Sequence, residues 1–148
     1  MPTVDMSLER LRVYQGVNPR PADFDEYWDR ALAEMNAIDP APVFPPADVP
    51  SAIAECYHLT FRSTKGARIY ACFVKPKNIC GKVPALLMFH GLSGSCDSFC
   101  KMLNYASQGY VVAFLDSRGQ GGLSEDVGGV SGTTYTTPFV RGLDGDPD

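Results

Sequence analysis

The residues Pro84-Ala-Leu-Leu-Met-Phe-His90-Gly-Leu-Ser-Gly94 decide the fold of this chain. Ala85 to Phe89 form a continuous apolar run without polar alternation. Such a run is typical of a strand that is covered on both faces, as in a parallel sheet between helix layers. The run stops at His90-Gly91, where glycine permits positive φ and a close approach of the backbone. The sequence therefore predicts a buried strand followed by a tight turn.

The next segment predicts a helix and a second strand. Phe99, Leu103 and Ala106 recur at helical spacing, and Gly109 stands where a C-terminal cap belongs. Tyr110 to Leu115 is again apolar. Strand, turn, helix and strand together predict a right-handed βαβ unit, whose loops lie at the carboxyl ends of the strands, where α/β folds bind their ligands.

Residues 1–50 predict two helices and a connector. The first helix is expected within Asp5 to Tyr14, and the second follows Asp23 and carries an aromatic stripe that we interpret as packing. Residues 39–50 are too proline-rich for a helix or strand and predict a semi-rigid extended connector. We therefore expect residues 1–50 to form an N-terminal helical part and residues 51–148 to form the main domain.

Residues 56–75 change to a period of two and predict an antiparallel hairpin that turns at residues 63–66. His58 lies on the opposite face of the first strand from Leu59, and we interpret it as a half-exposed histidine with a hydrogen-bond partner. After Gln120 the sequence becomes glycine-rich, and residues 141–148 predict an acidic loop. The alternating residues of the two strands are Tyr57, Leu59 and Phe61, then Ile69, Ala71 and Phe73.

Composition limits the classes of function. The chain has 148 residues with 13 basic and 17 acidic side chains, a net charge of −4, and no basic cluster. Nucleic acid and anionic membrane are therefore poor candidate partners. The N-terminus has no apolar region of the signal-peptide type, and no run reaches membrane-spanning length. We expect a cytoplasmic protein.

The five cysteines favour no metal site. The count is odd, no Cys-x-x-Cys pair occurs, and the histidines are His58 and His90 alone. We interpret the cysteines as reduced thiols that act as small apolar side chains. Cys96 lies near a predicted helix start, which favours a lowered pKa. We reject it as a catalytic nucleophile because no free histidine is available to activate it.

The turn at His90-Gly91-Leu92 has two interpretations. It is either a plain strand-to-helix connection or one part of an α/β-hydrolase site. In the latter, a main-chain N–H, here that of Leu92, points at the carbonyl oxygen of a bound ester and stabilises the negative charge of the tetrahedral intermediate.

Several segments together resemble the acetyl xylan esterase and cephalosporin-C deacetylase family, carbohydrate esterase family seven. The matching segments are residues 8–14, 18–28, 56–75, 89–91 and the triplet Arg118-Gly119-Gln120, which follows a strand ending in Asp116. The resemblance spans essentially the whole chain.

This resemblance implies a partial α/β-hydrolase fold, with N-terminal helices, then the antiparallel hairpin, then the parallel βαβ unit. It implies serine-dependent removal of acetyl groups from acetylated xylan, xylo-oligosaccharides and cephalosporin C, without a cofactor. It also implies that His90, Gly91, Arg118, Gly119 and Gln120 are scaffold of the substrate site, and that full-length relatives form homo-oligomers, typically hexamers. Leu92 stands where the family usually has Tyr, which affects the preference for the acyl or leaving group.

The catalytic triad is absent from this sequence. A nucleophile elbow needs Gly-x-Ser-x-Gly, and both residues 91–95 and residues 129–133 fail at the last position. No histidine follows His90 to act as the base, and His90 itself is expected to be structural. We therefore expect the chain to be the N-terminal portion of such an enzyme, truncated before the elbow, marginally stable and inactive alone, with an unpaired apolar sheet edge.

Three alternatives stay open at this point. The first is another α/β-hydrolase, such as a dienelactone hydrolase or a peptidase, and the Arg-Gly-Gln triplet argues against it. The second is a nucleotide-binding domain with residues 119–122 as its phosphate loop, but no helix follows these glycines. The third is a non-catalytic fragment that pairs with a separately encoded C-terminal half, which the sequence does not distinguish from truncation.

Overall fold

The computed structural model describes residues 5–92, 94–96 and 98–126 of the chain. The chain divides into two compact units, Met1–Glu34 and Met35–Asp148. The predicted acidic loop at residues 141–148 and the elbow-like pentapeptide at residues 129–133 lie outside the described residues.

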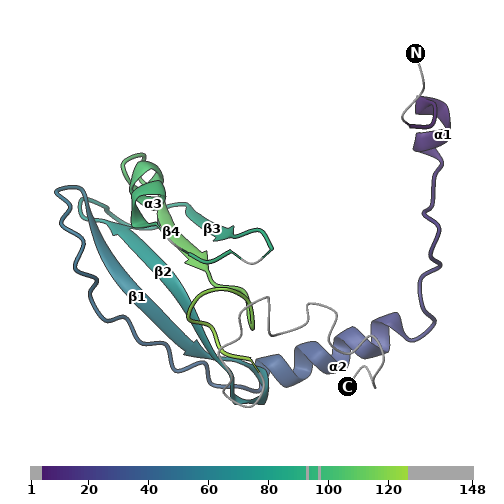
Figure 1. Ribbon diagram of the computed structural model, residues 1–148, viewed down its shortest axis with the longest axis horizontal. Coiled ribbons are helices and arrows are strands. Elements are labelled where there is room, and N and C mark those ends of the chain that lie inside the picture. Colours follow the sequence, from purple (N-terminus) through teal and green to yellow (C-terminus); the bar gives the residue numbers. More distant parts are fainter. Residues whose placement is uncertain (1–4, 93, 97, 127–148) are drawn as a thin grey trace. The chain divides into compact units, whose positions relative to one another are not determined.

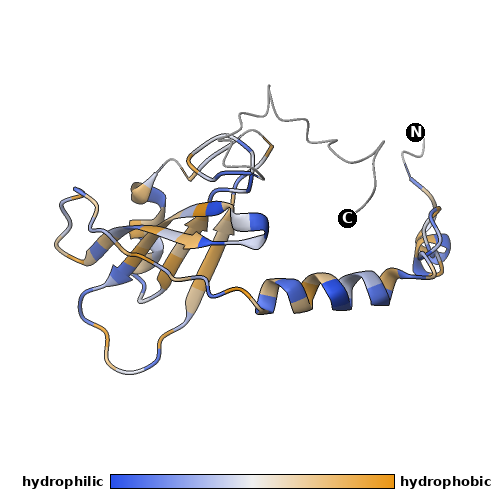
Figure 2. Ribbon diagram, turned by 90° about the horizontal axis from the view of Figure 1, so that it is seen from below, coloured by the Kyte–Doolittle hydropathy of each residue, from blue (hydrophilic) through white to orange (hydrophobic). Residues whose placement is uncertain are grey.

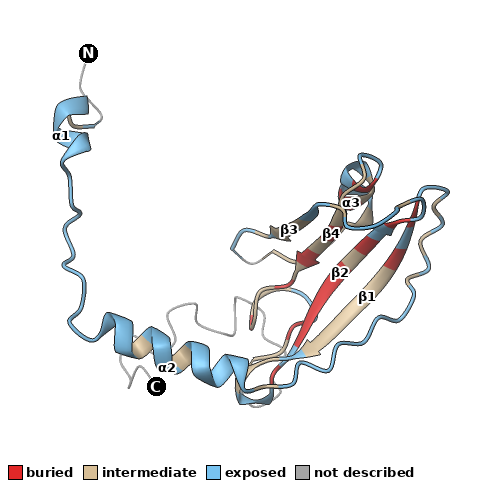
Figure 3. Cartoon of the chain, turned by 180° about the vertical axis from the view of Figure 1, so that it is seen from behind, coloured by how far each residue is buried: buried red, intermediate tan, exposed pale blue. Residues whose placement is uncertain are grey.

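The two expected N-terminal helices are present. Helix α1 covers Leu8–Arg12 and helix α2 covers Phe24–Asn36. The aromatic stripe of α2 packs along its own helix, with ring centroids 6.2 Å apart between Phe24 and Trp28. These two side chains remain 41% and 48% exposed, and both helices are coloured mostly as exposed in Figure 3.

The predicted hairpin is confirmed. Strand β1 (Ala54–Arg62) pairs antiparallel with strand β2 (Arg68–Pro76), and Tyr57 lies opposite Phe73. The turn between them is a short 3-10 helix at Thr64–Gly66, in which Lys65 and Gly66 have φ of 54° and 75°. The alternating residues named from the sequence therefore share one face of the sheet.

The predicted βαβ unit is confirmed as well. Strand β3 (Ala85–Phe89) pairs parallel with strand β4 (Val111–Leu115), and helix α3 (Phe99–Ala106) connects them (Figure 1). Gly109 has φ of 89°, and its N–H donates to the carbonyl of Ala106 at 3.0 Å, which closes the helix as expected. The strand order is β1-β2-β4-β3, a mixed sheet of the expected partial α/β fold.

One expectation for β3 is wrong. The apolar run predicts cover on both faces, but Leu87 and Phe89 are 57% and 61% exposed. Only Leu86 and Met88 pack against the core. The reason is topological: β3 is the last strand of the sheet that the described residues form, and α3 packs on one face of that sheet. An apolar run indicates that both faces of a strand can be buried, but it does not indicate which neighbouring elements cover them.

The core lies between α3 and the face of the sheet that carries His58. Figure 2 shows the apolar character of the strands, and Figure 3 shows that burial concentrates along β2. Met102 of α3 and Val74 and Val112 of the sheet are fully buried. This core fixes the carboxyl ends of β3 and β4, from which the candidate site is built.

The proline-rich connector is extended, as expected, and it covers the outer edge of β1. Val43 and Thr60 exchange two main-chain hydrogen bonds of 2.9 and 3.0 Å, and the His58 N–H donates to the Pro45 carbonyl at 2.8 Å. Phe44 packs edge-on against Phe73, with centroids 5.3 Å apart. The connector therefore protects a strand edge that would otherwise be open to pairing.

Candidate functional site

The His90 turn is anchored to the end of β4 by one hydrogen bond. The main-chain N–H of Ser117 donates to Nε2 of His90 at 2.9 Å. Because Nε2 accepts, the ring proton lies on Nδ1, which is 2.7 Å from the carbonyl oxygen of Gly91. The expected structural role of His90 has a physical basis in this bond, which joins the carboxyl ends of two parallel strands.

The close approach in this turn occurs at Gly94 rather than at Gly91. An added Cβ at Gly94 would lie 2.9 Å from Cβ of His90 and 3.0 Å from the carbonyl oxygen of Gly91. Gly91 has open space around it and does not have positive φ, contrary to the expectation from its residue type. Glycine at position 94 therefore allows the chain to fold back over His90, and the Gly94 N–H donates to Gly91 at 3.0 Å.

Leu92 lies at the outer point of this turn. Its side chain is 65% exposed. Its main-chain N–H has no acceptor among the described residues. A main-chain N–H without an acceptor among the described residues, at the carboxyl end of a parallel strand, has the property that an oxyanion donor requires.

Asp116 organises the loop that follows β4. Its carboxylate is buried and accepts hydrogen bonds from the main-chain N–H groups of Cys96 and of Leu123, the latter at 2.7 Å. The Ser124 hydroxyl donates to its carbonyl oxygen at 2.7 Å. Gly122 has φ of 112°, and an added Cβ there would overlap the Asp116 carboxylate. From the sequence, Asp116 is identified only as the end of the strand that precedes the Arg-Gly-Gln triplet, and this role is missed, although the glycines nearby in the chain signal a tightly packed loop.

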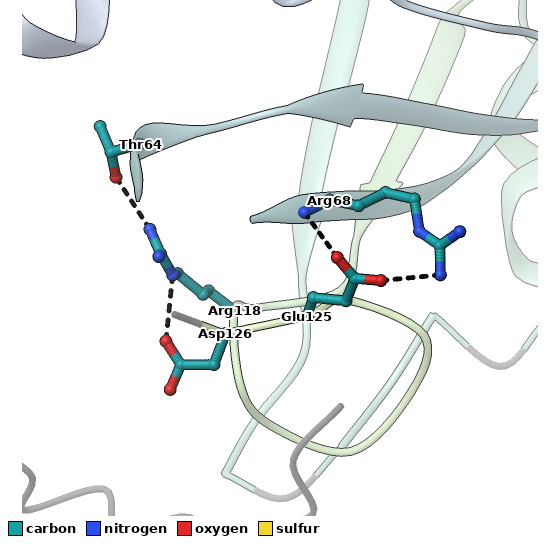
Figure 4. A network of polar contacts seen from close by, with 5 residues as sticks. All are labelled: Thr64, Arg68, Arg118, Glu125 and Asp126. Carbon is teal, nitrogen blue, oxygen red and sulfur yellow. Dashed lines mark hydrogen bonds and ion pairs between the residues drawn. The ribbon is translucent and has the colours of Figure 1, made fainter. Parts of the chain in front are cut away.

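Arg118 connects this loop to the β1–β2 turn. Its Nε donates to Asp126 at 3.1 Å and its Nη1 donates to the Thr64 hydroxyl at 2.8 Å (Figure 4). Its Nη2 is buried without a partner among the described residues. Gly119 has φ of 66°, and an added Cβ there would lie 2.9 Å from Asp126, so the Asp126 carboxylate requires glycine at this position.

A second pair of contacts closes the same loop. Arg68 and Glu125 form an ion pair of 2.9 Å, and the Glu125 carboxylate also accepts from the Arg68 main-chain N–H at 3.1 Å (Figure 4). The Gln120 N–H donates to the Ser117 carbonyl at 3.2 Å. The structure therefore brings His90 next to Ser117, at the base of the Arg118-Gly119-Gln120 loop, and directs Arg118 towards Thr64 and Asp126.

Cys96 does not have the lowered pKa expected near a helix start. Its hydrogen bond with the Cys72 thiol, then burial, then its contact with Asp116 raise its pKa. Helix α3 begins at Phe99, and Cys96 is buried against Asp116 and Cys72 instead of facing the helix N-terminus. Cys56, Cys72 and Cys96 are buried and outside any disulfide, as expected of reduced thiols that act as small apolar side chains, whereas Cys80 and Cys100 are exposed.

His58 has the partner expected from the sequence. Its Nδ1 lies 2.6 Å from the Tyr70 hydroxyl, and the two rings stack with centroids 5.8 Å apart. The described residues contain no group of three or more His, Cys, Asp or Glu side chains suited to a metal ion. In the same part of the chain, every helix is too short or too polar to cross a bilayer.

The family model described as acetyl xylan esterase (AXE1) matches residues 1–148, the whole chain. The chain belongs to the acetyl xylan esterase family. Acetyl xylan esterase 1 from Thermoanaerobacterium sp. JW/SL YS485 superposes with a TM-score of 0.84 at 49% identity, over 96% of this chain and 44% of that one. The acetyl xylan esterase from Paenibacillus sp. R4 superposes with a TM-score of 0.73 at 31% identity, over 82% and 39%.

The family membership confirms the resemblance inferred from the Arg-Gly-Gln triplet and the N-terminal segments. The chain spans less than half the length of these two solved esterases.

Proposed function

We propose that this chain is the oxyanion-binding portion of a serine esterase that removes acetyl groups from acetylated xylan, xylo-oligosaccharides and cephalosporin C. Membership of the acetyl xylan esterase family over all 148 residues supports the reaction class. The 49% identity to an acetyl xylan esterase supports the same substrate chemistry.

The Leu92 amide is the observation that carries the proposal. When a serine hydroxyl adds to the acetyl carbonyl carbon, the carbonyl electrons move to oxygen, and the resulting oxyanion needs donors that are already in place. The Leu92 N–H has no acceptor among the described residues and lies in an exposed turn at the carboxyl end of β3. Because it is a main-chain group in an anchored turn, it would need little reorganisation to donate a hydrogen bond to the oxyanion.

The surrounding residues act as scaffold in this proposal. The bond from Ser117 to His90 holds the turn to the end of β4. Arg118 ties the following loop to Thr64 and Asp126, Gly119 leaves space for the Asp126 carboxylate, and Gly91 is part of the turn itself. Gln120 belongs to the same loop, and its N–H bonds to Ser117.

The nucleophile, the acid and the catalytic histidine would come from sequence beyond these 148 residues. Neither Gly-x-Ser-x-Gly nor a histidine after His90 occurs here. We therefore expect no esterase activity from the 148 residues alone. The complete enzyme would need no cofactor and would assemble as a homo-oligomer, in the manner that the resemblance implies.

A chimera tests the proposal. The chain is expressed alone and also fused to the part of the Thermoanaerobacterium esterase that it does not match, and both are assayed with p-nitrophenyl acetate and acetylated xylo-oligosaccharides. We expect turnover only from the fusion, and we expect a serine-directed inhibitor to abolish it. Inhibitor-sensitive turnover by the chain alone would contradict the proposal, as would a folded but inactive fusion.

A further inference from the structure

Two buried thiols from distant segments meet in the core. Sγ of Cys72 in β2 lies 3.2 Å from Sγ of Cys96, which precedes α3, and 3.3 Å from the Cys96 carbonyl oxygen. The two side chains are 2% and 8% exposed. A disulfide needs an S–S distance of about 2.05 Å, so the sulfurs must approach by about 1.2 Å.

We propose that Cys72 and Cys96 form an oxidisable pair that a peroxide converts into an intramolecular disulfide. Overall, with hydrogen peroxide as the oxidant, two thiols lose two electrons and two protons, and one molecule of hydrogen peroxide is reduced to two molecules of water. In the first step the Cys72 sulfur attacks one oxygen of hydrogen peroxide, the O–O bond breaks and a sulfenic acid forms on Cys72, while the leaving hydroxide takes up the proton lost by Cys72 and departs as water. In the second step the Cys96 sulfur attacks that sulfur, the S–S bond forms, and the sulfenic oxygen leaves as water with the Cys96 proton.

The neighbours of Cys72 decide which thiol reacts first. Its Sγ lies 3.7 Å from the Tyr70 hydroxyl, which lies 2.6 Å from Nδ1 of His58. A Cys72 proton can therefore pass to Tyr70 while Tyr70 passes its own proton to His58. Cys96 lies instead against the Cys72 thiol and the Asp116 carboxylate, and these contacts, together with burial, raise its pKa and keep it protonated. Cys72 is accordingly the thiol that becomes the nucleophile.

The disulfide would join β2 to the segment that follows the Leu92 turn. Cys96 already bonds through its N–H to Asp116 at the end of β4. Oxidation would then link β2, the segment before α3 and the Asp116 loop covalently and by hydrogen bonds. A cross-link of this kind restricts the unfolded chain and raises the thermal unfolding midpoint.

Peptide mapping of the full chain tests the pair directly. The exposed Cys80 and Cys100 are first blocked under native conditions with N-ethylmaleimide. The protein is then treated with hydrogen peroxide, quenched with an alkylating reagent, digested and analysed by mass spectrometry. We expect one peptide pair that joins Cys72 to Cys96 and separates on treatment with dithiothreitol. Recovery of both cysteines as alkylated thiols or as unlinked sulfinic acids would overturn the proposal, as would a link from Cys72 to Cys56.

Substitutions test the proton route in the same protein. Cys100→Ser keeps the cross-link and Cys96→Ala removes it, and near-UV circular dichroism checks that both variants fold. We expect Tyr70→Phe to give the same cross-linked peptides at a rate lower by about tenfold or more, because it removes the hydroxyl between Cys72 and His58. An unchanged rate in folded Tyr70→Phe would exclude the relay.

Discussion

The main-chain N–H of Ser117 donates a 2.9 Å hydrogen bond to Nε2 of His90. This bond joins the carboxyl ends of β3 and β4, which are parallel neighbours in the sheet. It therefore holds the Leu92 turn at a fixed place beside the loop that carries Arg118. The His90 side chain therefore positions the turn by accepting a main-chain hydrogen bond, although histidine at such a site suggests a catalytic base.

Replacement of His90 tests this anchoring role. Glutamine places a side-chain acceptor near the position of Nε2, whereas asparagine reaches only as far as Nδ1. We expect His90→Asn to lower the free energy of unfolding by about 1–3 kcal/mol, because the partly buried Ser117 N–H loses its acceptor. His90→Gln is expected to recover most of that loss in urea unfolding. Equal losses in the two variants would show that the acceptor at Nε2 is unimportant.

Substitution of Gly122 tests the packing of the loop around Asp116. Gly122 and Gly81 both have positive φ, of 112° and 71°, but only an added Cβ at Gly122 would meet the Asp116 carboxylate. We expect Gly81→Ala to cost about 1–2 kcal/mol for the backbone conformation alone. Gly122→Ala should cost more, because the carboxylate must also move away from its donors at Cys96 and Leu123. Similar unfolding midpoints for the two variants would contradict a packed Asp116 loop.

The raised pKa of Cys96 predicts a loss of stability at alkaline pH. The folded state holds the Cys96 proton more tightly than the unfolded state, where a thiol has a pKa of about 8.5. The unfolded state therefore binds fewer protons above that pH, and the free energy of unfolding falls there by up to about 1.4 kcal/mol per pH unit for this group.

Denaturant titrations between pH 7 and 9.5 measure that loss. Cys96→Ala removes the group, so we expect its stability to decline less steeply with pH than that of the unsubstituted chain. Parallel pH profiles would mean that the Cys96 thiol titrates equally in the folded and unfolded states.

Much of the fold follows from sequence periodicity. Tyr57 and Phe73 face each other as the period of two requires, and Phe99 to Ala106 form the helix that their spacing predicts. The apolar run of β3 does not by itself predict the exposure of Leu87 and Phe89, because it carries no information about which elements cover it. The extended connector was predicted, whereas its bonds to β1 depend on pairing between Val43 and Thr60, which no local pattern encodes.

The parts of the candidate site that can be predicted from the sequence are those whose residues are neighbours in the chain. The Leu92 turn and the Arg118 triplet are of this kind. The role of Asp116 in organising the loop is not predicted from the sequence, because its hydrogen-bond donors, Cys96 and Leu123, come from separate segments. Cys72 and Cys96 are 24 residues apart in the sequence, so no local spacing pattern predicts their contact. Long-range polar contacts are fixed by the packing of α3 on the sheet rather than by local sequence.

The role of the Leu92 amide is tested most directly by removing its hydrogen. Proline at position 92 has no N–H, whereas alanine keeps the N–H and removes only the exposed side chain. Both substitutions are made in the active fusion with the Thermoanaerobacterium esterase, and kcat for p-nitrophenyl acetate is compared after circular dichroism and thermal unfolding have shown that both fold. We predict that Leu92→Pro lowers kcat by about 10²–10³-fold while Leu92→Ala stays close to the parent. A folded Leu92→Pro variant with the same kcat as Leu92→Ala would contradict the assignment of this amide to the oxyanion.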